Sequence, residues 1–84
     1  MDTNDISRLR KIVGLREVTK YLALDKLQTI VLATDADPDY EKKVLGLASA
    51  KNVPVLRAET KVRLAELCGI DKIATVVGIL KQQD

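Results

Sequence analysis

The spacing of apolar positions changes several times along this 84-residue chain, and each change predicts a new secondary-structure element. Apolar residues three or four positions apart indicate helices, whereas short runs of branched aliphatic residues between polar ones indicate buried strands. The predicted helices span residues 6–11, 15–25, 38–51 and 61–68. The predicted strands span residues 12–13, 29–34, 53–56 and 74–80. This alternation predicts an α/β fold, a three-layer α/β/α sandwich with a small mixed four-stranded sheet.

Two of the predicted helices have clear terminal signals. Pro38 suits the first position of a helix, which leaves Asp37 as its N-terminal cap. Thr60 suits the cap of the helix at 61–68, and Gly69 suits the left-handed residue that ends it. The length is sufficient for one domain, so we expect a single domain over residues 1–84.

The residue types present exclude several kinds of chemistry. The chain has no His, which removes the commonest general base and the commonest metal ligand. A single cysteine, Cys68, excludes an internal disulfide and a Cys-rich zinc site, and we expect it to be a small buried hydrophobe. We expect no metal or other cofactor.

No apolar run approaches the ~20 residues that a membrane-spanning helix needs. The N-terminal stretch is acidic first and basic later, which is not typical of a secretory signal. We therefore expect a cytoplasmic protein that does not span a membrane.

Charges are segregated along the chain although the net charge is only +2. Residues 8–20 and 57–63 are predominantly basic, and residues 35–41 contain acids without a base. Such segregation indicates a polyanionic partner more strongly than the net charge alone does. The alternative is that these runs are simply solvated faces.

Residues 14–20 are the first candidate binding segment, because they open a helix after a short strand. The backbone N–H groups at a helix start attract phosphate. Arg16, Glu17 and Lys20 lie three or four positions apart, so their side chains can share one face. The structural alternative is an ordinary helix start with a Glu17–Lys20 ion pair.

Asp35 and Asp37 form a second candidate, because a buried strand followed by Asp-x-Asp is how some magnesium-dependent phosphatases present their carboxylates. Such enzymes need further motifs on a longer chain, so a capping turn before Pro38 is the favoured alternative. The segment 57–61 also follows a strand and opens a helix, and its structural alternative is a capped connection.

Four stretches resemble one known family when they are taken together. They are GLREVTK at 14–20, LATDADP at 32–38, KNVPV at 51–55 and TKVRLAELCGI at 60–70. In this order and spacing they resemble the ribosomal protein L7Ae family, and within it the small bacterial proteins that bind kink-turn RNA. The resemblance implies an α/β/α sandwich without catalytic activity. It also implies binding to kink-turns, which are RNA duplexes bent sharply at a three-nucleotide bulge beside tandem sheared G·A pairs.

The resemblance also implies roles for individual residues. Gly14 would allow close backbone approach, Glu17 would accept hydrogen bonds from a guanine edge, and Lys20 would reach a guanine or a phosphate. Asp37 would face an extruded nucleotide, Lys51 would lie near the RNA backbone, and Ala58 would cover the extruded base. The full set of expected RNA-binding residues is Gly14, Leu15, Arg16, Glu17, Lys20, Asp37, Pro38, Lys51, Arg57, Ala58, Glu59 and Thr60.

The chain departs from the family pattern at two positions. Arg16 stands where many members have Asn, and Ala65 stands where many have Gly. We expect a monomer that binds ribosomal RNA or a riboswitch. A protein–protein interaction module on the same fold is the alternative, and it would be favoured if Arg16, Lys20 and Lys51 did not converge on one surface.

Overall fold

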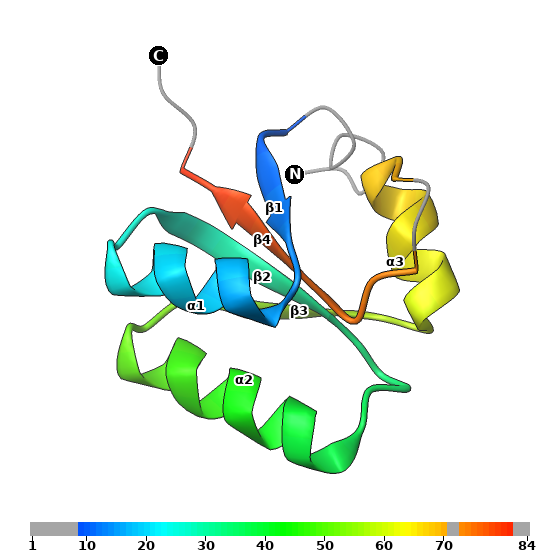
Figure 1. Cartoon of the computed structure of the whole chain (residues 1–84), viewed down its shortest axis with the longest axis horizontal. Helices are drawn as coiled ribbons and strands as arrows, with labels where there is room; N and C mark the ends of the chain where they lie inside the picture. Colours follow the sequence, from blue (N-terminus) through cyan, green and yellow to red (C-terminus); the bar gives the residue numbers. More distant parts are fainter. Residues whose placement is uncertain (1–8, 71–72, 82–84) are drawn as a thin grey trace.

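The sheet of the protein has four strands that do not all run in the same direction. The computed structural model describes residues 9–70 and 73–81, and its strands are β1 (Lys11–Val13), β2 (Leu27–Ala33), β3 (Val55–Ala58) and β4 (Val76–Leu80). They lie in the order β1-β4-β2-β3 (Figure 1). Strand β4 is antiparallel to both β1 and β2, whereas β2 and β3 are parallel. The first three strands therefore share one direction, which confirms the expected mixed sheet.

Helices cover the two faces of this sheet. Helices α1 (Leu15–Ala23) and α2 (Pro38–Ala50) pack on one face, and α3 (Lys61–Cys68) packs on the other (Figure 1). Alternate residues of β2 separate the two cores, with Ile30 and Leu32 towards α1 and α2 and Val31 towards α3. All of these side chains are buried, since both faces of the central strand are covered. The three-layer sandwich is thus confirmed.

The helix predicted at residues 6–11 is wrong over its described part. Residues 9 and 10 are irregular, and Lys11 begins β1, where it pairs with Ile79 of β4. Pairing with a distant strand outweighs the local helical pattern here. Residues 6–8 lie outside the described residues.

Strand β3 begins two residues later than the sequence predicts. Pro54 has no N–H to donate, but its carbonyl accepts hydrogen bonds from the Ile30 N–H and the Thr29 hydroxyl, each at 3.0 Å. The parallel ladder with β2 then continues through Arg57 and Ala58. Arg57 and Ala58, which the sequence assigned to a connecting loop, are therefore strand residues.

Each of the three parallel strands leads into a helix at the same edge of the sheet. We call this edge, where β1, β2 and β3 end and β4 begins, the carboxyl edge. The opposite edge, where the helices end and the parallel strands begin, is the amino edge. The topology therefore gathers three helix N-termini at the carboxyl edge (Figure 1). Within the described ranges, no helix has the length and apolar character needed to cross a membrane.

Candidate nucleic-acid interface

The start of α1 is shaped by Gly14. Its φ of 101° lies in the region that L side chains rarely adopt, and its N–H donates to the Val76 carbonyl at 3.0 Å. Within the described residues, no side-chain cap bonds to the first turn, and no atom apart from Gly14 and its two chain neighbours lies within 4 Å of where a Cβ would stand. The described residues therefore leave the backbone at this helix start uncovered.

The side chains of the first turn have few internal partners. Arg16 is exposed, Glu17 is half-buried, and Leu15 packs against the core beneath α1. Among residues 9–70 and 73–81, no ion pair or side-chain hydrogen bond engages Glu17, so the Glu17–Lys20 pair of the structural alternative is absent there. The Lys20 ammonium instead lies 5.6 Å from the centre of the Tyr21 ring. Glu17 therefore keeps its full hydrogen-bonding capacity for a ligand.

The start of α2 has the cap that its sequence predicts. One carboxylate oxygen of Asp37 accepts a hydrogen bond from the Asp39 N–H at 3.0 Å, and Pro38 occupies the first turn. Asp37 and Pro38 are both exposed. A carboxylate has room for several hydrogen bonds, so Asp37 can hold the helix and still accept from a ligand.

The start of α3 is held by residues from two loops. The Thr60 hydroxyl accepts from the Arg63 N–H, and the Asp35 carboxylate accepts from the Lys61 N–H, both at 2.9 Å. The Thr34 N–H donates to the Ala58 carbonyl at 2.8 Å, and the Thr34 hydroxyl donates to the Glu59 carbonyl. The loops after β2 and β3 therefore form one hydrogen-bonded unit.

These contacts bear on the phosphatase alternative. Asp35 and Asp37 each accept from the backbone at the start of a different helix, which supports their interpretation as capping residues. No group of three potential metal-ligating side chains occurs in the described part of the chain.

Tyr40 is a residue of this edge that the sequence analysis did not select. It belongs to the first turn of α2 and packs partly buried against the core beneath α1. Burial raises the pKa of the Tyr40 phenol, and a hydrogen bond with the backbone of Leu15 offsets part of that rise. Tyr40 therefore joins the starts of α1 and α2. Its only sequence signal is that it is one of two aromatic residues in the chain.

Ala58 does not present the apolar surface expected of it. Its side chain is only 3% exposed and belongs to the core beneath α3. Val62, in the first turn of α3, is 54% exposed instead. The sequence contains a signal for this, because Val62 lies two positions before Leu64 and so falls off the buried face of the helix. Val62 is therefore an exposed apolar side chain at the start of α3.

Arg57 and Lys51 are both engaged in ion pairs. The Arg57 guanidinium lies 2.8 Å from the Glu41 carboxylate, which ties β3 to α2. Lys51 caps the far end of α2 at the amino edge, with its ammonium 3.3 Å from the Asp25 carboxylate. Since a 13-residue helix is about 20 Å long, the structure does not bring Lys51 together with Arg16 and Asp37.

The carboxyl edge carries more acidic than basic residues. The segments 14–17, 34–41 and 59–63 contain the acids Glu17, Asp35, Asp37, Asp39, Glu41 and Glu59 and the bases Arg16, Lys61 and Arg63. The fold therefore places the acidic run beside the basic ones. A polyanion would bind here through directed hydrogen bonds and helix N-termini, because the net charge does not favour it.

Residues 7–84 match the model of the ribosomal protein L7Ae/L30e/S12e/Gadd45 family. The chain belongs to this family. An RNA-binding protein of Halalkalibacterium halodurans is 31% identical over 70 residues, which cover 83% of this chain and 85% of that protein. An RNA-binding protein of Bacillus pumilus is 36% identical over 69 residues, covering 82% and 84% respectively. The family resemblance drawn from the four sequence stretches is thus confirmed.

Solved structures of other proteins share the fold of this L7Ae-family chain. A 15.5 kDa RNA-binding protein of Giardia lamblia superposes with a TM-score of 0.82 at 22% identity, covering 96% of this chain and 72% of that one. A Bacillus halodurans protein of unknown function superposes with a TM-score of 0.82 at 21% identity, covering 94% and 80%. At these identities the likeness shows the fold alone.

Proposed function

We propose that this L7Ae-family protein is a non-enzymatic RNA-binding protein that recognises kink-turns with its carboxyl edge. The observation that carries the proposal is the gathering of three helix starts at one edge, with the open backbone of Gly14 beside the Glu17 carboxylate, which has no partner among the described residues. Relatives named as RNA-binding proteins support it. We propose further that it acts as a single-domain cytoplasmic monomer on ribosomal RNA or a riboswitch.

The chemistry of the edge suits a distorted duplex. An ordinary A-form helix has a major groove too narrow for side chains, so a protein reads its unpaired or distorted regions. At a kink-turn the sheared G·A pairs would meet the start of α1. Glu17 would accept hydrogen bonds from guanine, while Arg16 and the first-turn backbone would hold phosphate.

The starts of α2 and α3 would receive the extruded nucleotide. Asp37 would accept from its base with the capacity that the capping bond leaves, beside Pro38. Val62 would provide the apolar cover in place of Ala58, with Glu59 and Thr60 at its rim. Arg57 would hold Glu41 in place, and Lys51 is not part of this proposed surface.

The test is a titration of the protein into a kink-turn RNA and into the same RNA with its G·A pairs changed to Watson–Crick pairs. We expect a preference for the intact RNA of ~1–3 kcal/mol for each lost base contact. Equal affinities would indicate that the binding is non-specific and electrostatic, and would contradict the proposal.

A protein–protein interaction module is the second candidate. The separation of Lys51 from Arg16 favours it, because the expected convergence of Arg16, Lys20 and Lys51 does not occur. The same titration distinguishes the two candidates, since such a module would bind neither RNA.

A further inference from the structure

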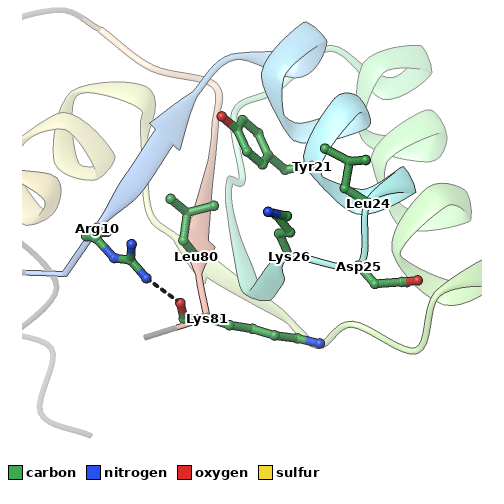
Figure 2. A pocket seen from close by; sticks show the side chains of 7 residues that line it. All are labelled: Arg10, Tyr21, Leu24, Asp25, Lys26, Leu80 and Lys81. Carbon is green, nitrogen blue, oxygen red and sulfur yellow. Dashed lines mark hydrogen bonds between the residues drawn. The ribbon is translucent and has the colours of Figure 1, made fainter. Parts of the chain in front are cut away.

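The amino edge holds a pocket of about 460 Å³ at the opposite end of the sheet from the proposed kink-turn site (Figure 2). Tyr21, Leu24 and Leu80 form its apolar wall, and Arg10, Lys26 and Lys81 supply positive charge around it. Strand β2, which separates the two edges, has seven residues and so spans on the order of 20 Å. Most of the pocket therefore lies at the other end of the sheet from the start of α1.

A chain of hydrogen bonds fixes the frame of this pocket. The Lys26 N–H donates to the Tyr21 carbonyl at 3.0 Å, and the Lys81 N–H donates to the Lys26 carbonyl at 2.9 Å. The Arg10 guanidinium donates to the Lys81 carbonyl at 2.8 Å, and the Leu80 N–H donates to the Arg10 carbonyl at 3.0 Å. The three basic residues are thus joined to one another and to Tyr21 by backbone hydrogen bonds and by one from the Arg10 guanidinium.

The charge around the pocket is strongly one-sided. Of the described residues that line it, only Asp25 is acidic, and Asp25 lies 3.3 Å from the Lys51 ammonium in an ion pair. Figure 2 shows the Lys26 side chain between Tyr21, Leu80 and Asp25, with the Lys81 side chain extending below it. Among the described residues, the acidic excess of the carboxyl edge has no counterpart at this pocket. Non-specific attraction to a polyanion therefore falls mainly on the amino edge.

We propose that this pocket binds a single-stranded segment of RNA, separate from any kink-turn at the carboxyl edge. One base would stack on the Tyr21 ring against Leu80, and the neighbouring phosphates would lie at Lys26 and Lys81. Aromatic stacking combined with a cationic rim is how proteins bind single strands without sequence preference. An acidic polypeptide would use the cations but not the flat ring, so the combination favours RNA. The protein would then bridge two segments of one folded RNA.

The test measures binding of a fluorescein-labelled octauridylate to the full chain at several salt concentrations. The double variant K26A/K81A should lose at least tenfold in affinity near 0.1 M salt. Its logarithmic salt slope should fall in magnitude by about 1.4, since each single-strand phosphate contact contributes about 0.7. Tyr21→Leu should lose about tenfold with an unchanged slope, because it removes stacking and no charge.

The matched control is K42A/K43A, which removes the same charge from exposed positions on α2. It should lose less than threefold, and thermal melting should show that every variant compared remains folded. Equal losses in K42A/K43A and K26A/K81A would overturn the proposal, as would the absence of octauridylate binding. Displacement of the octauridylate by hexaglutamate at equal concentration would assign the pocket to an acidic protein instead.

The result of the octauridylate test can be distinguished from the result of the kink-turn titration. K26A/K81A should keep the wild-type ratio of affinities for the intact and the G·A-changed RNA, both made without single-stranded ends. If wild-type protein shows no kink-turn preference while octauridylate binding still depends on Lys26 and Lys81, only the proposed function fails. If K26A/K81A abolishes the kink-turn preference itself, the two sites are not independent and this inference fails.

Discussion

The carboxylate of Asp35 accepts a hydrogen bond from the backbone N–H of Lys61 at 2.9 Å, so the turn after β2 holds the first turn of α3. Two loops that lie far apart in the sequence thereby become one surface. The acidic run at 35–41 consequently stabilises helix starts as well as repelling phosphate, and this explains how so acidic a segment can belong to a proposed RNA-binding edge.

Replacing Asp35 tests this structural role. Asp35→Ala should lower the free energy of unfolding by ~0.5–2 kcal/mol, the usual cost of losing a helix cap. Asp35→Asn should lose less, because its amide oxygen can still accept from Lys61. Urea denaturation of both variants measures the difference. Wild-type stability in Asp35→Ala would show that the bond contributes nothing.

Val62 and Ala58 should respond in opposite ways to substitution. Val62→Ser should weaken kink-turn binding several-fold with almost unchanged stability, because its side chain is exposed at the carboxyl edge. Ala58→Leu should instead destabilise the fold by ~1–3 kcal/mol, since it overpacks the core beneath α3. Paired binding and denaturation measurements check both effects. Full affinity in Val62→Ser would remove Val62 from the proposed surface.

Lys51 should matter little for kink-turn binding. Lys51→Ala should change affinity for an RNA without single-stranded ends by less than about threefold, because Lys51 lies at the amino edge beside Asp25. Arg16→Ala removes the same charge at the carboxyl edge and should lower the affinity for this RNA more. A larger loss of affinity in Lys51→Ala than in Arg16→Ala would place the RNA at the amino edge and contradict the proposed site.

Cys68 should make stability sensitive to alkaline pH. Burial raises the pKa of its thiol, and the Lys11 ammonium lowers it by a smaller amount. Above ~8.5 the unfolded chain loses its thiol proton while the folded chain keeps it, so deprotonation favours unfolding. Stability should therefore fall as the pH rises above ~8.5, and fall less in Cys68→Ala. Parallel pH profiles for the two proteins would contradict this assignment.

Much of the fold follows from local sequence signals. Pro38, Thr60 and Gly69 act on their own helix ends, so their roles could be predicted without knowing the rest of the molecule. Lys11 could not be placed in the same way. It becomes a strand residue only because Ile79, from the other end of the chain, pairs with it.

The candidate site was harder to predict because it depends on how elements meet. Ala58 is buried because the ladder with β2 runs two residues beyond the apolar run that suggested the strand. Lys51 could have been placed from topology, since a helix that follows a strand carries the chain back to the opposite edge of the sheet. The spacing of Val62 from Leu64 already indicated an exposed side chain, but the place of Tyr40 and Val62 in the site depends on how the three helix starts meet.

Glu17 provides the most direct test of the central claim, which is that the carboxyl edge reads bases through directed hydrogen bonds. The comparison is the affinity of wild type and Glu17→Ala for the intact kink-turn at several salt concentrations. Bulk electrostatics predicts tighter binding when an acid is removed from an acidic edge. Our account predicts that Glu17→Ala binds ~1–3 kcal/mol more weakly with an unchanged salt slope. Tighter binding by Glu17→Ala would contradict it.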